Sequence, residues 1–320
     1  MSVLRHVLAS ISPASAAHAE AARQNVAGAA APLLERLAAL LGGAQHSARP
    51  RAARRTIVVC AGDHGVGDPG IALGAAHPTV VAATAIAEGS AALAQLARAS
   101  RTPIVVVDAG AVEGGAMPPS VVRLGRGPSR DLLHEPAMTI VDAALGLEAG
   151  IALAVSLADD GLDVLAIGAL GVGADVSSAA LLGAALGAVP TGLGDPEAEA
   201  AAARGAARAG AGGLELLAGF GGPETAVLAG LVVAMASMNV PVILDGYATG
   251  AAALVAALLA PAVRGYLIAA HTGSFTHPRI LAHLGLSPVF EVGLGHGEGT
   301  GAAMVLPLID QVSALSARVG

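Results

Sequence analysis

The sequence predicts an α/β fold in which a parallel sheet, Rossmann-like in arrangement, carries helices on both faces. Short runs of β-branched and aliphatic residues alternate with longer Ala-rich stretches of helical length, and this alternation is typical of strand–helix–strand units. The short runs are apolar throughout rather than at every second position, which indicates strands that are buried on both faces of the sheet. Both observations therefore point to the same class of fold.

Five of the short runs are predicted to be strands of this sheet. They cover residues 56–60, 104–107, 164–167, 240–244 and 266–269. The Ala-rich stretches that separate them are predicted to be helices, at 79–98, 142–158, 177–188, 225–238 and 249–260. Each strand run leads into Gly, Asp, His or Ser. Open α/β sheets bind their ligands at this C-terminal edge, so these polar ends form a candidate site.

The N-terminal part of the chain has a different pattern. Residues 15–55 are Ala-rich, with leucines at helical spacing. An arginine cluster at 49–55 closes this segment directly before the first strand run, and we interpret it as a solvated linker. We therefore expect residues 1–55 to pack as helices beside the C-terminal end of the chain, outside the sheet.

Composition limits the classes of partner. The 320 residues are 54% hydrophobic and only 13% charged, against roughly 25% charged in ordinary globular proteins, which argues against disorder. The net charge is −7, and no polybasic stripe is present, so we expect neither nucleic acid nor a membrane surface as a partner. Five aromatic residues in all are too few for a surface that stacks bases.

The mean hydropathy of +0.69 raises the question of a membrane span. Residues 225–244 carry no charge over the length of a spanning helix. We interpret them instead as a helix at 227–238 followed by a strand, because Asn239 and Pro241 mark a turn between the two. We expect no signal peptide, and the single cysteine, Cys60, fits a reducing cytoplasm.

Two glycine-rich segments could carry chemistry. The run from Gly168 through Gly171 and Gly173 to Asp175 follows a strand and opens a helix, an arrangement that offers backbone N–H groups to an anion. It lacks the lysine of a phosphate-binding loop, and Asp175 could simply cap the helix. The second segment, residues 295–301, holds one carboxylate, Glu298, among four glycines.

Small neighbours around Glu298 suit a substrate that packs flat against the backbone beside a carboxylate. The alternatives are a solvent loop or a helix cap. We predict that residues 168–178 and 295–301 face each other across one cleft. A third hypothesis, a metal-assisted hydrolase, would use Asp63, His64 and His271. The ten histidines show no zinc-type spacing, although His271 and His277 lie close in one loop.

Taken in order, the polar segments resemble the nicotinate-nucleotide–dimethylbenzimidazole phosphoribosyltransferase family, which assembles the lower ligand of vitamin B12. The matching stretches are AGDHGV (61–66), VVDAG (106–110), GRGPSRDLLHEPAMT (125–139), the glycine-rich turn at 168–173, TGLGD (191–195), FGGPE (220–224), PVILDG (241–246), AAH (269–271) and GEGTGAA (297–303). The resemblance runs from about residue 55 to the C-terminus.

This resemblance implies an organisation and a reaction. It implies a helical segment at 1–55 that joins a C-terminal helix at 306–320 in a small domain, an α/β catalytic domain at 56–305, and a homodimer. It implies transfer of ribose 5-phosphate from nicotinate mononucleotide to dimethylbenzimidazole or a related azole base, with inversion at the anomeric carbon. No cofactor and no metal are implied. Glu298 matches the catalytic glutamate, which accepts the azole proton and stabilises the developing positive charge.

The resemblance also implies residues that contact the substrates. They are His77, Gly171, Gly173, Asp175, Ser177, Thr191, Gly192, Arg204, Asp245, Gly246, His271, Ser274 and Gly297.

The chain departs from the family pattern at several of these places. A second active-site glutamate is Ala169 here, and an Asn-Thr pair is Ala174-Asp175. A family lysine falls on Ala201, for which Arg204 could substitute, and His77 and Ala85 replace a serine and a glutamine of the base pocket. These departures leave open an alternative, a divergent or inactive paralogue that binds a nucleotide or azole.

Overall fold

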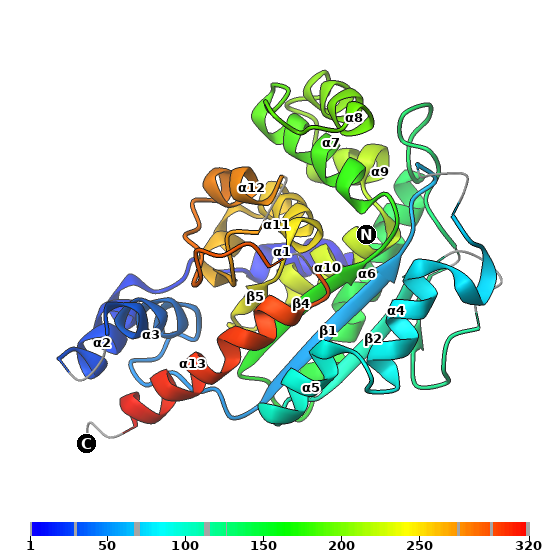
Figure 1. Ribbon diagram of the computed structural model, residues 1–320. Helices are drawn as coiled ribbons and strands as arrows, with labels where there is room; N and C mark the ends of the chain where they lie inside the picture. The colour runs from blue at the N-terminus through cyan, green and yellow to red at the C-terminus, as the bar shows by residue number, and fades with distance from the viewer. Residues whose placement is uncertain are drawn as a thin grey trace.

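The computed structural model describes residues 2–28, 31–66, 71–111, 116–125, 127–273, 276–294 and 297–317 (Figure 1). Within these residues, six strands form one fully parallel sheet in the order β3-β2-β1-β4-β5-β6. The strands are β1 Arg55–Gly62, β2 Ile104–Gly110, β3 Val122–Arg123, β4 Val164–Leu170, β5 Val242–Leu244 and β6 Leu267–Ala269. The strand order reverses between β1 and β4, which makes that place the switch point of the sheet.

Helices connect the strands and cover the sheet, so the predicted fold class is confirmed. The helices at the start of the chain are α1 Ser2–Ser10, α2 Ala16–Val26, α3 Pro32–Ala44, α4 Pro78–Ala87 and α5 Ala92–Ala99. Those in the middle are α6 Ile140–Ala158, α7 Ala174–Leu186, α8 Pro196–Ala206, α9 Gly213–Phe220 and α10 Pro223–Ser237. The last are α11 Tyr247–Leu259, α12 His277–Leu284 and α13 Thr300–Ser316, with 3₁₀ turns at Gly74–Ala76 and Pro261–Tyr266.

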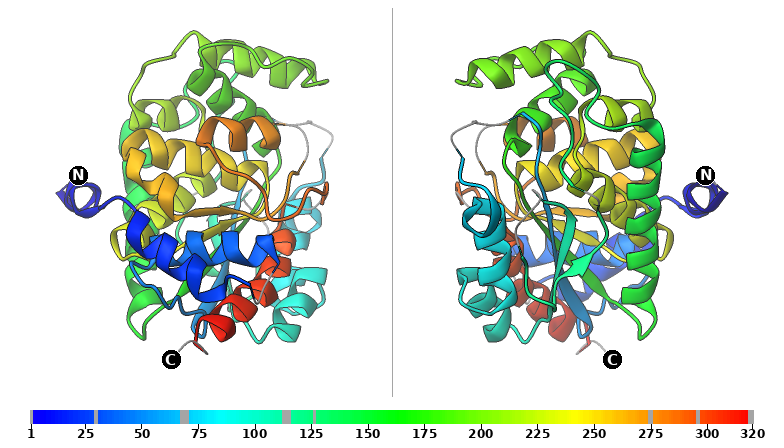
Figure 2. Two further views of the ribbon diagram at one scale, coloured as in Figure 1. Left: turned by 90° about the vertical axis from the view of Figure 1, so that its left-hand side faces the viewer. Right: turned by 90° about the vertical axis from the view of Figure 1, so that its right-hand side faces the viewer.

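Helices cover both faces of the sheet (Figure 2), and each face has its own apolar core. Val58 and Cys60 of β1 pack with α6, α7, α9, α10 and α11, whereas Ile57 and Val59 pack with α2, α3, α4, α5 and α13. The alternation within β1 follows from the two-residue period of a strand. Because both faces are covered, the strands need apolar residues at every position, as the sequence pattern indicated.

Helices α2 and α3 pack against each other and against α13, so this N-terminal helix pair lies beside the last helix of the chain (Figure 1). The first helix, α1, departs from the prediction, because it packs on α10 and α6 of the sheet domain rather than beside the C-terminal helix. In the part of the chain that the structure describes, residues 1–55 therefore contribute helices and no strand before Arg55, as predicted. The domain boundaries stay a prediction, and α13 begins at Thr300, before the predicted start of the C-terminal helix at 306.

The structure corrects several element boundaries. The predicted helix at 79–98 is two helices, because Gly89 adopts a left-handed φ of +85° and breaks the chain between α4 and α5. Strand β3 escaped prediction because it is two residues long and exposed, with no apolar run to mark it. Helices α8, α9 and α12 were also not among the predicted elements. Residues 225–244 form α10 and then β5, as predicted.

By length and composition alone, two described stretches could cross a membrane, Pro78–Ala99 and Ile140–Ala158. The first spans both α4 and α5, and a third of the apolar window in each stretch is buried within the fold. Apolar helices of this kind also occur in the cores of soluble proteins, so the two stretches are weak evidence of a span.

Candidate active site

The ends of β1 and β4 lie next to each other at the switch point. Two hydrogen bonds join the segments that follow them: His64 N donates to Val172 O at 3.0 Å, and Val172 N donates to the side-chain Oδ1 of Asp63 at 2.9 Å. A Cβ at Gly171 would collide with the carbonyl oxygen of Gly62. The glycine-rich turn therefore packs directly on the end of β1, and glycine is required for that close approach.

Glu298 lies over the end of β4. A Cβ at Gly168 would be 2.5 Å from the carbonyl carbon and oxygen of Glu298, so only glycine lets the two backbones meet. Ala169 N donates to Gly297 O at 3.2 Å, and Gly246 approaches Gly297 from the end of β5. The described residues 297–301 thus lie directly against the start of the 168–178 segment, and the predicted cleft between the two segments stays a prediction. The Glu298 residue is half-buried at this edge.

Asp245 follows β5 and is fully buried beneath the start of α13. Its Oδ2 accepts a hydrogen bond from Gly299 N at 2.8 Å, and its Oδ1 accepts one from Ala302 N at 2.7 Å. His271 is also buried, with Nε2 3.6 Å from Asp245 Oδ1. Both side chains were expected to contact substrate, and the structure places them behind the backbone of the Glu298 loop.

A second buried histidine, His277, stacks on His271 with ring centroids 5.8 Å apart. Burial, reinforced by the neighbouring His271, lowers the pKa of His277 to about 4. This ring is therefore neutral at physiological pH and packs under the loop without a charge of its own.

His64 and Glu224 form a buried ion pair on the other side of the switch point. His64 Nε2 lies 3.1 Å from Glu224 Oε1, which also accepts a hydrogen bond from Thr225 Oγ1 at 2.7 Å. Burial alone would lower the pKa of His64, but the Glu224 carboxylate outweighs it and the net direction is upward. The pKa of Glu224 is lowered, because the attraction of His64 and the hydrogen bonds together exceed the burial penalty.

Tyr247 and Asp175 lie close to this pair. Burial, with the charges of Asp175 and Glu224, raises the pKa of the Tyr247 hydroxyl to about 12. Asp175 is in the first turn of α7, where a carboxylate is favoured by the helix dipole. Sequence reasoning assigned no role to Glu224 or Tyr247, although Glu224 belongs to the FGGPE stretch that carries part of the resemblance.

Asp63, which follows β1, contacts His77 and Thr79 at the start of α4. Thr79 Oγ1 donates to Asp63 Oδ1 at 2.5 Å, and His77 Nδ1 lies 3.6 Å from Asp63 Oδ2. His77 caps α4 by accepting from Thr79 N at 3.3 Å and is buried. Among the described residues, no group of three or more His, Cys, Asp and Glu side chains is arranged to hold a metal. Asp63 accepts hydrogen bonds from Thr79 and Val172, and His64 pairs with Glu224.

The remaining predicted residues are spread over the same edge and its surroundings. Ser177 is buried and donates its hydroxyl to Phe220 O at 2.7 Å, which joins α7 to the end of α9. Thr191 O accepts a hydrogen bond from the Arg279 guanidinium, and Gly192 follows with a left-handed φ of +69°. Arg204 is exposed in the last turn of α8. Ser274, together with residues 295 and 296, lies outside the described residues.

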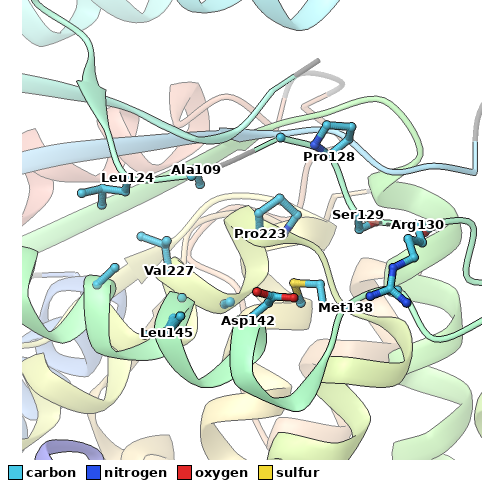
Figure 3. A pocket seen from close by; sticks show the side chains of 16 residues that line it. Ala109, Leu124, Pro128, Ser129, Arg130, Met138, Asp142, Leu145, Pro223 and Val227 are labelled. Carbon is cyan, nitrogen blue, oxygen red and sulfur yellow. Dashed lines mark hydrogen bonds between the residues drawn. The ribbon is translucent and has the colours of Figure 1, made fainter. Parts of the chain in front are cut away.

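A separate cavity of about 240 Å³ lies between α6, α10 and the 124–138 segment (Figure 3). Its lining includes the apolar side chains of Leu124, Met138 and Leu145, and Arg130 and Asp142 add charge. Glu298 is not part of its lining. The cavity is on the face of the sheet opposite α13, so we keep it apart from the candidate site.

The fold and this edge define an α/β enzyme with its site at the switch point of a parallel sheet, where a carboxylate stands in a glycine-rich loop. Residues 11–319 match the sequence model of a family described as phosphoribosyltransferase. The chain is 37% identical to the nicotinate-nucleotide–dimethylbenzimidazole phosphoribosyltransferase of Roseiflexus sp. (strain RS-1), over 96% of this chain and 93% of that protein. It is 34% identical to the protein of the same name from Desulforudis audaxviator (strain MP104C), over 100% and 96%.

Solved structures agree with the sequence comparison. The crystal structure of CobT from Thermus thermophilus superimposes with a TM-score of 0.81 at 32% identity, covering 94% of this chain and 96% of that one. The chain therefore belongs to the nicotinate-nucleotide–dimethylbenzimidazole phosphoribosyltransferase family, as the resemblance predicted.

Proposed function

We propose that this protein transfers ribose 5-phosphate from nicotinate mononucleotide to dimethylbenzimidazole or a related azole base, giving α-ribazole phosphate and nicotinate. The names of its relatives support this reaction and give no support to an inactive paralogue. The observation that carries the proposal is the place of Glu298, a half-buried residue whose backbone lies against Gly168 at the end of β4, next to the hydrogen bond from Ala169 N to Gly297 O.

The transfer of ribose 5-phosphate needs one carboxylate, which accepts a proton and stabilises a positive charge. The bond between the anomeric carbon and the nicotinate nitrogen breaks, and its electron pair neutralises the pyridinium, so this leaving group needs no acid. A nitrogen of the azole attacks the opposite face and becomes part of a cation. Its second nitrogen then gives its proton to Glu298. The carboxylate thus stabilises the developing cation and removes the proton, which is worth roughly 10²–10⁴-fold in rate.

We assign the mononucleotide to the glycine-rich turn and the neighbouring loops. α7 begins directly after Gly171 and Gly173, so this turn brings the N-terminus of a helix to the edge of the sheet, where backbone N–H groups favour an anion. Asp175 in that first turn would repel a phosphate, so the Thr191–Gly192 turn, steadied by Arg279, is the better candidate for contact with the phosphate.

We further propose that the protein acts as a homodimer in the cytoplasm. Large aliphatic side chains stand exposed along one face of α6, among them Val141, Leu145 and Val155. A patch of this kind on a helix that already packs on α10 is suited to a second copy of the chain. The single, buried Cys60 is consistent with a reducing compartment.

The test is incubation of the purified protein with nicotinate mononucleotide and dimethylbenzimidazole, followed by chromatography for the riboside phosphate. A parallel tube with chelator tests the metal-dependent alternative. Formation of α-ribazole phosphate and nicotinate in equal amounts, unaffected by the chelator, is the expected result. Binding of the mononucleotide without product would favour the inactive paralogue instead.

A further inference from the structure

The carboxylate of Asp245 grips the first turn of α13. It is 0% exposed, and its two oxygens accept from Gly299 N at 2.8 Å and from Ala302 N at 2.7 Å. Hydrogen bonds from backbone N–H groups to a buried carboxylate are short and strong, and the positive end of the helix dipole adds to them. The start of α13 is therefore held at a defined distance from the end of β5.

The surroundings leave Asp245 little freedom. Its backbone N donates to Thr249 Oγ1 at 3.0 Å, which anchors it to the start of α11. A Cβ at Gly301 would lie 2.6 Å from Asp245 Oδ1 and would also collide with the His271 ring. The carboxylate, the histidine and α13 thus fit together with no space for one extra methyl group.

Glu298 lies between two anchored peptide groups. On one side, Gly297 O accepts from Ala169 N of β4 at 3.2 Å; on the other, Gly299 N donates to Asp245. Beneath it, Gly168 lets the Glu298 backbone contact the strand. Asp245 is therefore the side chain that fixes the peptide immediately after the base.

We propose that Asp245 is a positioning residue for the transferase reaction: buried and away from substrate, it sets the place of the Glu298 carboxylate by clamping the start of α13. This inference rests on the proposed function. A displacement of a catalytic group by about 1 Å can cost on the order of 10²-fold in rate, because the reacting atoms leave their attack geometry.

The test substitutes Asp245→Asn. The amide oxygen of Asn accepts one of the two N–H groups, whereas its NH₂ faces the other and repels it. We expect kcat to fall by about 10- to 100-fold, with KM for nicotinate mononucleotide changed less than about twofold. A 10- to 100-fold rise in KM with an unchanged kcat would instead assign Asp245 to substrate binding and overturn the proposal.

A matched control lies at the opposite edge of the sheet. Asp163 is also buried, and its Oδ2 accepts from Arg54 N at 2.9 Å just before β4 begins. Asp163→Asn should lower the melting temperature and leave kcat unchanged. If both variants lose kcat in proportion to their loss of stability, Asp245 has a structural role only and the proposal fails.

A double-mutant cycle with Glu298→Gln separates positioning from general damage. If Asp245 acts through Glu298, Asp245→Asn should reduce the single-turnover rate in the wild-type background and change it less than about twofold in the Glu298→Gln background. Losses that multiply in the double variant would show that Asp245 acts on something other than the base.

A second variant keeps the test open if Asp245→Asn does not fold. Gly301→Ala leaves the carboxylate in place, favours the helix, and pushes Asp245 and α13 apart. We expect kcat of Gly301→Ala to fall by about tenfold or more. Gly219→Ala is the control and should keep its kcat, because a Cβ at Gly219 meets open space. A normal kcat in Gly301→Ala would contradict the positioning role of Asp245. Activity of the wild-type protein would still support the proposed function in that case. An inactive wild type defeats both.

Discussion

The imidazole of His64 pairs with the carboxylate of Glu224 at 3.1 Å, and both side chains are buried. His64 follows β1, and Glu224 is in the first turn of α10. Because His64 N also donates to Val172 O, the pair connects three segments at the switch point. A Cβ at Gly62 or Gly222 would lie against Glu224, so these glycines make room for the carboxylate.

Replacing Glu224 with Gln should destabilise the protein in a pH-dependent way. The raised pKa of His64 contributes stability that is complete below its unfolded value of 6.5 and is lost as pH rises through the folded value. The lowered pKa of Glu224 contributes stability that is complete above 4.5 and is lost as pH falls through the folded value. The pair therefore stabilises most between pH 4.5 and 6.5.

In that window Glu224→Gln should cost about 1–3 kcal/mol, because the buried imidazole loses its charged partner and gives up its proton. Urea unfolding of both proteins between about pH 5 and about pH 9 measures the difference. The difference should shrink as pH rises past the folded pKa of His64. A difference that stays flat across the range would mean that the pair is not charged in the folded protein.

Replacing Glu298 with Gln should remove most turnover and leave mononucleotide binding nearly intact. Gln keeps the size and hydrogen-bonding shape of Glu but can neither accept the azole proton nor offset the developing cation. We expect a loss on the order of 10²–10⁴ in single-turnover rate. Calorimetric titration with nicotinate mononucleotide checks that binding is preserved.

The competing role for Glu298 is electrostatic support of α13, which begins two residues later. A carboxylate at a helix N-terminus stabilises by only about 0.3–1 kcal/mol. That role predicts a small drop in melting temperature with a normal rate. Measuring both quantities on the same Glu298→Gln protein separates the two roles, and an unchanged rate would remove Glu298 from the mechanism.

The sequence predicted the sheet but not the long-range contacts that cover some of its polar residues. Uniformly apolar strands such as β4 are visible in sequence because both of their faces are buried. Asp245 and His271 also stand at strand ends, yet they are covered by α13, whose start lies more than twenty residues further along the chain. No local pattern reports such a contact, because it depends on how α13 packs on the sheet.

Glu224 illustrates the same limit from the other direction. Its neighbours Gly221, Gly222 and Pro223 look like an ordinary turn before a helix. Its partner His64 is 160 residues away in the chain, and only the packing of α10 on the sheet beside the end of β1 brings the two together.

Ala169 occupies the place where the resemblance leads one to expect a second carboxylate. It is in register with Cys60 of β1. Burial raises the pKa of this cysteine, and the charge of Glu224 adds to the shift. The carboxylate whose charge reaches Cys60 belongs to α10 rather than to β4.

Loosening the Thr191–Gly192 turn should weaken mononucleotide binding. The Arg279 guanidinium of α12 donates to Thr191 O and so joins this turn to the rest of the site. Arg279→Ala removes that link, and we expect KM for the mononucleotide to rise about 5- to 30-fold, the equivalent of one lost charge-assisted hydrogen bond of about 1–2 kcal/mol. The value of kcat should stay within about twofold, because Glu298 is untouched.

Arg36→Ala is the matched control for Arg279→Ala. Arg36 also donates to backbone carbonyls, those of Ser287 and Pro288, on a segment to which we assign no substrate contact. This variant should keep both KM and kcat. An effect of Arg279→Ala on kcat alone, or equal effects of the two variants on KM, would contradict a mononucleotide role for the turn.

The exposed face of α6 should control the oligomeric state. Val141 is 65% exposed and Leu145 is 51% exposed, and the two lie one helical turn apart on α6. Burying such side chains between two copies would remove apolar surface from water, at roughly 25 cal/mol per Å². Leu145→Glu places a charge in that interface, so it should convert a dimer into monomers in light-scattering measurements of molar mass.

The control for Leu145→Glu is Leu258→Glu on α11, where a leucine is 40% exposed outside the α6 face. The Leu258→Glu protein should have the same molar mass in solution as the wild-type protein. It should also lose little stability, as surface substitutions usually do. A wild type that is monomeric at assay concentrations would dispose of the dimer proposal outright. A dimer that survives Leu145→Glu would place the interface on another face of the molecule.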